Sequence, residues 1–469
     1  MKRCIWFAIV LGITLPTSAD DGRISKEGIL ASITAGHPAV VVLTEHPASA
    51  ESERSAADTT TQQSKPAAAV REPTGSLTLA EALALALTEN PELAPFAWHE
   101  RADEARIIQA SLRINPELNL QVEDVLGTGA YSGGSQAQTT LQLSQVIELG
   151  GKRAARREVA SRARGITQFE YESVRVDVLA NVTQRFIHVV AKQQSLELAI
   201  TNHRLAEDAL TTVQKRVEAG KASALEATKA QVALARGEVL VGATRNELNA
   251  ARKLLAASWR NDDPVFERAE ADLFARRPIP PYQALAGQIS SSPEIARWIS
   301  EKRLREAEIK LADALRVPNL TVGGGIRLLE GNGEEALVFG LTMPLPLFDR
   351  NQGGSAELRA EFGRAEADQK AAEFRIGAVL LGLYEETVHN IHVIEGLERK
   401  ILPMAEEALA ISREGYVQGR FSYLEVLDAQ RTVFDVRQEY IRMATSYHQL
   451  LVEIERLTGQ PFEGGELHR

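Results

Sequence analysis

The sequence predicts a mainly helical protein with a small β part, built from one unit that occurs twice. A glycine turn at Gly220 is repeated about 199 residues later at Gly419, with Ser, Leu-Glu and Ala-Gln at matched places. Aromatic residues make up only 5% of the 469 residues, and Ala, Leu, Glu and Arg are plentiful, as in long helices. Segments with a two-residue apolar period interrupt the helical pattern once in each half, and these predict strands.

The N-terminus has the pattern of an export signal. Two basic residues precede an apolar run from Ile5 to Leu15, and small residues ending at Ala19 offer a cleavage site. This run is too short to span a bilayer as a helix. We therefore expect a signal peptide over 1–19, followed by a disordered leader over 20–74, where Ser, Thr, Ala, Pro and charged residues are mixed.

Composition excludes several classes of function. The net charge of −10 argues against nucleic acid as a partner. Cys4 is the single cysteine, so disulfides and thiolate metal sites are excluded. The sequence holds no Gly-rich phosphate loop and no nucleophile motif, so we expect neither an enzyme nor a cofactor.

Each half contains two segments that alternate between apolar and polar residues. In the first half these lie at about 118–122 and 139–143, and in the second at about 320–328 and 339–345. Strands of about ten residues are long enough to cross a bilayer when tilted. Four strands do not close a barrel, which needs about eight, so strands in a membrane would require several chains. The alternative is a small sheet packed on helices.

Long helices follow the strands in both halves. No proline interrupts 151–217, which at 1.5 Å per residue gives a helix of about 100 Å. The matching stretch 353–417 contains Pro403, where we expect a kink. Helices of about half that length, 224–259 and 423–457, come after the glycine turns.

The duplication sets the expected domain boundaries. They are, in order, a first repeat, a proline-rich linker at mid-height, a second repeat and a tail, over 75–260, 261–281, 282–459 and 460–469.

Each glycine turn is predicted to be the tip of a helical hairpin. Gly220 and Gly419 end a helix with a left-handed residue, and Ser223 and Ser422 begin the next helix as N-caps. The Leu-Glu pair then places a carboxylate in the first turn, where the helix dipole favours it.

Two segments that lead from a strand into a helix add local sequence patterns to the duplicated order of elements. They are Val146-Ile147-Glu148-Leu149-Gly150-Gly151-Lys152-Arg153 and Pro344-Leu345-Pro346-Leu347-Phe348-Asp349-Arg350-Asn351-Gln352-Gly353. With the duplicated order of helix, strand, strand, long helix, tip and half-helix, residues 77–459 resemble the outer membrane efflux protein family, the TolC-like channel-tunnels. The second segment is similar to the subgroup that serves heavy-metal pumps (CzcC-like).

This resemblance implies a homotrimer in the outer membrane. Three chains would form a twelve-stranded β-barrel in outer membrane lipid, continued by a twelve-helix α-barrel across the periplasm. The protein would be the exit duct of a tripartite pump for heavy-metal cations. Its partners would be a periplasmic adaptor and an inner-membrane RND-type transporter. The alternatives are a duct for drugs or type I secreted proteins, or a periplasmic adaptor or coiled-coil scaffold of another class.

The resemblance also implies a gate at the periplasmic end. Glu425 and Asp428 match the carboxylates that close this end in the family, and in a trimer they would form stacked negative rings that select cations. Glu226 takes the place of Glu425 in the first repeat, where Lys229 replaces Asp428. Tyr416 matches a family tyrosine that helps to hold the closed tip. The alternative is an ordinary solvated first turn.

The tips resemble the surfaces that meet the adaptor. Phe421 stands where the family has an arginine, which leaves the family's hydrogen-bond lock open here. The residues expected to contact the adaptor are Arg216, Val217, Gly220, Ser223, Gly419, Arg420, Phe421 and Ser422.

One set of residues has the spacing of metal ligands. Glu385, His389 and His392 follow each other at i, i+4 and i+7 on one helix face. Carboxylate and imidazole groups suit zinc or cobalt. The alternative is a polar stripe that faces the lumen or another subunit.

Overall fold

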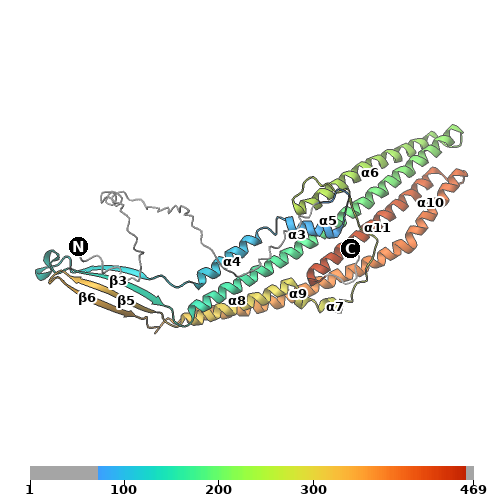
Figure 1. Ribbon diagram of the computed structural model, residues 1–469. Helices are drawn as coiled ribbons and strands as arrows, with labels where there is room; N and C mark the ends of the chain where they lie inside the picture. The colour runs from blue at the N-terminus through green and yellow to red at the C-terminus, as the bar shows by residue number, and fades with distance from the viewer. Residues whose placement is uncertain (1–71, 461–469) are drawn as a thin grey trace, which may run out of the picture. The chain divides into compact units, whose positions relative to one another are not determined.

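The computed structural model describes residues 72–460 (Figure 1). The expected signal peptide at 1–19, nearly all of the leader expected at 20–74 and nearly all of the tail expected at 460–469 lie outside the described residues.

The two repeats contain the same elements in the same order. The first repeat consists of α3 (Leu79–Glu89), α4 (Phe96–Ser111), β2 (Glu117–Glu123), β3 (Gln138–Ile147), α5 (Lys152–Glu218) and α6 (Ala224–Ala256). The second consists of α7 (Tyr282–Ala286), α8 (Pro293–Leu315), β5 (Leu320–Leu329), β6 (Glu334–Thr342), α9 (Gln352–Gly396), α10 (Leu402–Val417) and α11 (Tyr423–Thr458). The long helices and the half-length helices therefore lie where the sequence predicts them.

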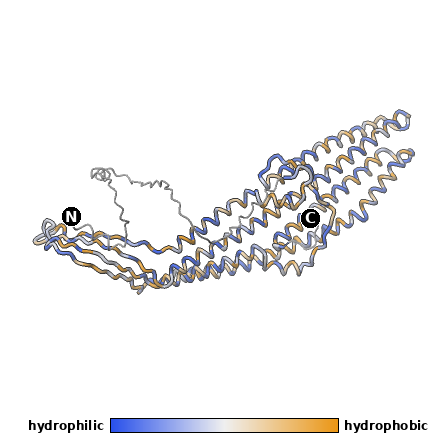
Figure 2. Tube along the Cα trace, in the orientation of Figure 1, coloured by the Kyte–Doolittle hydropathy of each residue, from blue (hydrophilic) through white to orange (hydrophobic). Residues whose placement is uncertain are grey.

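The four strands form one antiparallel sheet in the order β2-β3-β5-β6. The register places one apolar row across all four strands, Leu120, Leu141, Ile326 and Leu337, all of them exposed. The next row on the opposite face is Gln121, Thr140, Arg327 and Ala336, in which Arg327 donates a hydrogen bond to Thr140 (3.0 Å). The predicted alternation is confirmed, because the register gives the sheet one apolar face and one mainly polar face. Figure 2 shows hydrophobic and hydrophilic residues following each other along these strands.

The sheet has two open edges. Within the described residues, the outer sides of β2 and β6 pair with no other strand. An open edge presents a row of unpaired backbone N–H and C=O groups, which is a template for pairing with another chain.

The helices beside the sheet follow the order of the strands. α4 packs against α5, α5 against α8, and α8 against α9. Helix α5 continues past this row and packs against α6 and α11 (Figure 1). No helix among the described residues is both long enough and apolar enough to cross a membrane.

The main apolar core lies halfway along α5. It joins Val178, Val182 and Phe186 of α5 with Leu79 and Leu85 of α3, all of them buried. The end of α6 and the linker also contribute, through Leu255, Trp259 and Phe266. Burial at this level fixes the linker to the middle of the long helix.

The chain enters this core through a contact that the sequence analysis missed. β1 (Ser76–Leu77) pairs in parallel with β4 (Arg268–Ala269) of the linker. Just before β1, the Glu72 carboxylate accepts hydrogen bonds from Trp259 Nε1 (3.0 Å) and from the N–H of Val265 (2.7 Å). Two-residue strands are too short to give a periodic signal in a sequence.

Helix α4 begins only at Phe96, five residues after Pro91. The reason is Asn90, whose side chain accepts a hydrogen bond from the N–H of Glu92 (2.8 Å) and donates one to the carbonyl of Ser258 (2.9 Å). These bonds hold residues 90–92 in a turn. In the second repeat Ser292 is an ordinary N-cap, so α8 begins directly at Pro293.

The interruption predicted at Pro403 is present as a π-helical turn. Leu397–Ile401 forms this turn between α9 and α10, so the second long helix has two segments. Proline has no N–H to donate, and a π turn accommodates the missing bond. β6 ends at Thr342, short of the expected Leu345, because Pro344 and Pro346 have no N–H for the ladder.

Two adjacent glycines in β5 test the register of the sheet. A Cβ at Gly325 would collide with the carbonyl oxygen of Leu141 and lie 2.8 Å from Cα of Gln142, whereas at Gly324 its nearest neighbour is the Phe339 ring at 3.7 Å. We expect Gly325→Ala to destabilise the protein by about 1–3 kcal/mol, since backbone atoms cannot move aside. Gly324→Ala is the matched control, and equal melting temperatures for the two variants would contradict the register.

Candidate functional site

The two helical hairpins end in turns of the same geometry. At the first tip Gly220 has φ +69°, and the N–H of Lys221 donates to the carbonyl of Arg216 (2.7 Å). At the second tip Gly419 has φ +79°, and the N–H of Arg420 donates to the carbonyl of Gly415 (2.8 Å). Both are Schellman turns, in which a left-handed glycine lets the chain satisfy the last carbonyls of the helix.

The first turns after the tips use their glutamates differently. Glu425 folds back on its own N-cap and accepts bonds from the N–H (2.6 Å) and the hydroxyl (3.0 Å) of Ser422. Its counterpart Glu226 gives only its N–H to Ser223 (3.3 Å). The carboxylate of Glu226 is thereby left available for another partner.

That partner is Tyr416 of the second hairpin. Its hydroxyl donates to the Glu226 carboxylate over 3.1 Å, and its ring is buried (4% exposed). Burial, together with this hydrogen bond, raises the pKa of Tyr416 to about 12. The hydroxyl therefore keeps its proton, and its role as donor, at any physiological pH.

Arg216 joins the hairpins a second time. Its guanidinium lies 4.5 Å above the Tyr416 ring and donates hydrogen bonds to the carbonyls of Tyr416 and Val417, the latter at 3.0 Å. These carbonyls belong to the end of α10, where a cation is favourable. Arg216 was expected to contact the adaptor, but it lies between the hairpins of its own chain.

A small apolar core surrounds this link. Val213 of α5 and Ala230 of α6 pack with Tyr423 and Val426 of α11 around Tyr416. We call Arg216, Glu226 and Tyr416, with these four core residues, the tip cluster. It combines residues from both repeats, so separating the two hairpins would expose an apolar core and break the hydrogen bonds made by Arg216 and Tyr416.

The other residues expected at the adaptor surface differ in exposure. Val417 is 66% exposed, whereas Phe421 is only 38% exposed because its ring lies against Gly415. A side chain at Gly415 would collide with this ring, so the close contact requires glycine. Val217 packs against the tip cluster. The remaining five are Gly220, Ser223, Gly419, Arg420 and Ser422, all exposed at the turns.

The expected gate carboxylates lie on the exposed side of α11. Glu425 and Asp428 are both exposed, and within the described residues the Asp428 carboxylate forms no hydrogen bond or ion pair. Lys229, which takes the place of Asp428 in the first repeat, is exposed as well. The Asp428 carboxylate is therefore open to solvent.

The metal-ligand pattern does not form a site. Glu385, His389 and His392 are exposed, and Nδ1 of His392 is hydrogen-bonded to the carbonyl of Val388 (2.9 Å). Across residues 72–460, no three His, Cys, Asp or Glu side chains come together in a way that would hold a metal ion.

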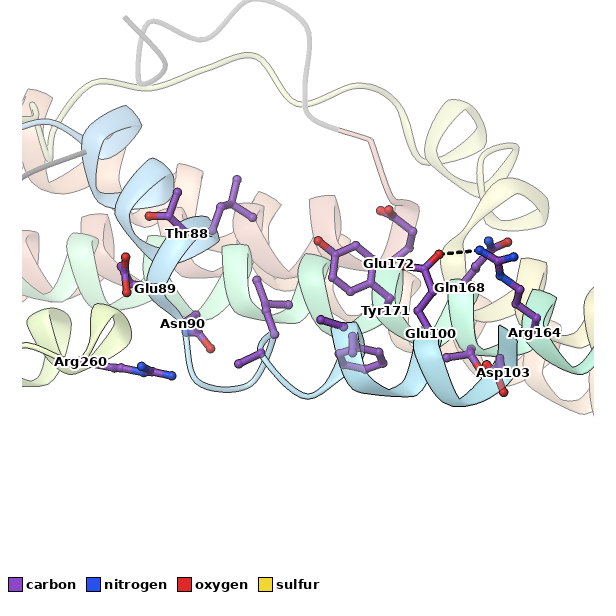
Figure 3. A pocket seen from close by; sticks show the side chains of 16 residues that line it. Thr88, Glu89, Asn90, Glu100, Asp103, Arg164, Gln168, Tyr171, Glu172 and Arg260 are labelled. Atoms are coloured by element: carbon purple, nitrogen blue, oxygen red, sulfur yellow. Dashed lines mark hydrogen bonds and ion pairs between the residues drawn. The ribbon is translucent and has the colours of Figure 1, made fainter. Parts of the chain in front are cut away.

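A cavity lies far from the tips, between α5, α4 and the turn before α4 (Figure 3). It has a volume of about 690 Å³. On its charged side Arg164 binds Glu100 (2.7 Å), and Asp103 is buried (2% exposed) with one oxygen lacking a partner among the described residues. Tyr171 and Phe96 form its apolar side, with their rings edge to face at 5.5 Å.

Comparison with known proteins assigns the family. The sequence profile described as "Outer membrane efflux protein" matches residues 82–259 and 285–460, once for each repeat. This chain belongs to the outer membrane efflux protein family. The family membership expected from the glycine tips and the duplicated order is confirmed, and it places the protein in the outer membrane.

Relatives and solved structures agree with this family. The cobalt-zinc-cadmium resistance protein CzcC of Cupriavidus metallidurans is 34% identical over 83% of this chain and 92% of its own length. The nickel-cobalt-cadmium resistance protein NccC of Alcaligenes xylosoxydans is 27% identical over 63% of this chain and 70% of its own. The outer membrane protein VceC of Vibrio cholerae shares the fold, with TM-score 0.65 at 17% identity, covering 82% and 97% of the two chains.

The link made by Arg216 can be tested by hydrogen exchange. We expect Arg216→Gln to weaken the contact by about 1.5–3 kcal/mol, since the carbonyls at the end of α10 lose a charged donor. Exchange of residues 413–421 should accelerate roughly tenfold or more. Lys215→Gln is the matched control, because Lys215 is exposed and has no side-chain partner within the described chain. Unchanged exchange in the Arg216 variant would show that the link does not hold the hairpins together.

Proposed function

We propose that this protein is the outer membrane duct of a tripartite RND-type efflux pump that exports heavy-metal cations. The observation that carries the proposal is the 34% identity to a cobalt-zinc-cadmium resistance protein along almost its whole length. The relative NccC, a nickel-cobalt-cadmium resistance protein, supports the same class of substrate.

The duct is a homotrimer. A chain with four strands has two open edges, and three chains joined edge to edge give a closed twelve-stranded barrel with no open edge in lipid. The apolar face of the sheet then contacts outer membrane lipid, and the face with Gln121, Thr140 and Arg327 lines the lumen. The helices continue the barrel as a twelve-helix tunnel through the periplasm.

The tips form the closed end of this tunnel. Tyr416 and Arg216 hold the second hairpin against the first, and the exposed carboxylates of Glu425 and Asp428 form rings at the entrance. Such rings attract cations and repel anions. The adaptor opens the end by contacting the exposed turns around Gly220 and Gly419, and the inner-membrane transporter supplies the energy and selects the substrate.

Deletion of the gene tests the substrate class. We expect the deletion strain to become several-fold more sensitive to zinc, cobalt or cadmium, with resistance restored by the wild-type chain. Sensitivity to organic solvents and antibiotics is the control. A strain sensitive to these compounds but not to metals would contradict a metal pump and favour a duct for drugs.

Conductance in planar bilayers tests the closed tip. Tyr416→Phe removes the bond to the Glu226 carboxylate and keeps the ring, which we expect to favour the open state by about 1.5–3 kcal/mol. The open probability should rise roughly tenfold or more. Tyr131→Phe, at an exposed tyrosine in the loop between β2 and β3, is the control. Equal conductance of the two variants would exclude Tyr416 from the gate.

A further inference from the structure

The free side of α4 carries a bulky apolar residue that nothing in the described part of the chain covers. Trp98 is 68% exposed, and Arg101 lies over its ring at 4.8 Å. The side of α4 that packs on α5 is marked by the buried Asp103 and the half-buried Ile107. Trp98 points away from this side, since it lies five residues from Asp103 at 100° per residue.

The internal duplication allows the free side of α4 to be compared with the corresponding side of α8, which is covered by another helix. Pro91 and Pro293 mark the same place in the two repeats, so Trp98 and Ala105 of α4 correspond to Ser300 and Ala307 of α8. Ser300 (6% exposed) and Ala307 (2% exposed) are buried in α8, which has α9 on one side and α5 on the other. Helix α4 has α5 on one side, and within the described residues no helix covers the other side.

The free helix at the opposite end of the row is α9. The order α4-α5-α8-α9 is the order of the strands, so a ring of copies brings α9 of one copy against α4 of the next. The side of α9 that points away from α8 is exposed. It carries one bulky apolar residue, Phe374 (82% exposed), and a stripe of small residues, Ala360, Ala367, Ala371, Ala378 and Gly382. Small residues on one helix leave room for a large side chain from the other.

Contacts within the chain fix the level of each residue along the helices. Phe96 of α4 meets Tyr171 of α5, and Glu170 of α5 lies 3.8 Å from Arg297 of α8. Glu294 of α8 binds Arg375 of α9 at 2.5 Å. Phe96 therefore lies at about the level of residues 373–375 in α9.

In a trimer whose threefold axis runs parallel to the helices, each residue lies at the same height along the axis in all three copies. The levels found within one chain therefore also hold between α4 of one copy and α9 of the next. Because α4 and α9 run in opposite directions, Trp98 lies at the level of Ala371, and Ala105 at the level of Arg364. Arg101, which has no acidic partner among the described residues, comes to the level of Asp368, whose carboxylate also lies 3.5 Å from Arg364 of its own helix.

We propose that α4 of one copy packs along α9 of the next, with Trp98 inserted beside Ala371, and that this seam fastens the trimer below the barrel. The proposal rests on the trimer proposed above and adds the surfaces that meet and their register. A tryptophan that buries its exposed area against a helix with small side chains is the kind of residue that dominates an interface.

Cysteine cross-linking tests the register directly. In a Cys4→Ser background, the pair Trp98→Cys with Ala371→Cys and the pair Ala105→Cys with Arg364→Cys are at matched levels. The exchanged pairs, Trp98→Cys with Arg364→Cys and Ala105→Cys with Ala371→Cys, are offset by about 10 Å. A disulfide forms only when the Cα atoms lie within about 7 Å. We therefore expect mild oxidation of outer membranes to link the matched pairs into trimers and to leave the offset pairs unlinked.

The exchanged pairs also control for folding, since they contain the same four substitutions. Native mass spectrometry of the unoxidised protein reports the oligomer independently. A trimer in which the matched pairs do not link, or in which all four pairs link equally, would overturn the seam and leave the duct unaffected. A monomer would overturn the seam and the trimer together.

Discussion

The need of every backbone N–H and C=O for a hydrogen-bond partner controls the architecture of this protein. In lipid no water can satisfy the outer side of an edge strand, so a sheet with two open edges is incomplete there. The duplication yields only four strands, and their order leaves β2 and β6 open. The order of the helices copies the order of the strands, so the same two ends of the row stay free throughout. The proposed trimer would close both the sheet and the row of helices at these two ends.

The tip cluster shows how a duplicated chain gains an asymmetric device. Glu226 and Glu425 stand at matched places, yet Glu425 caps its own helix and Glu226 binds the tyrosine of the other hairpin. The two glutamates bind different partners because the residues at the ends of the preceding helices differ. Arg216 in the first repeat corresponds to Gly415 in the second, where the Phe421 ring takes the space of a side chain. Arg216 and Tyr416, which join the hairpins, therefore stand at positions where the repeats differ, since their counterparts are Gly415 and Val217.

Much of the fold could be predicted from the sequence because its signals are long and periodic. The 67-residue helix α5, the alternating strands and the two glycine tips each repeat a pattern over many residues. The late start of α4 could not be predicted, since it depends on Asn90 reaching Ser258, 168 residues away in the chain. The parallel pair β1 and β4 is too short to be periodic.

Only part of the candidate site could be predicted, because some of its contacts join residues that are far apart in the sequence. Tyr416 and Glu226 were placed by their resemblance to family positions, and the structure brings them together. Arg216 was assigned to the adaptor surface because the tips resemble the surfaces that meet the adaptor in the family. Its true position depends on the second hairpin, which lies 200 residues further along the chain and is brought beside it by tertiary packing. The exposed trio of Glu385, His389 and His392 shows the converse, a ligand spacing with no site around it.

The π-helical turn before Pro403 makes the two repeats mechanically unequal. Helix α5 is continuous from the sheet to the first tip, so its two ends are expected to move together. Its counterpart is divided at Leu397–Ile401, where the wider turn allows the two segments to bend relative to each other. A pull on both tips would therefore move the second hairpin about this joint and leave the first in place. In the proposed trimeric duct, the closed end would then widen by the movement of the second hairpin of each copy about this joint, while the first hairpin keeps its position.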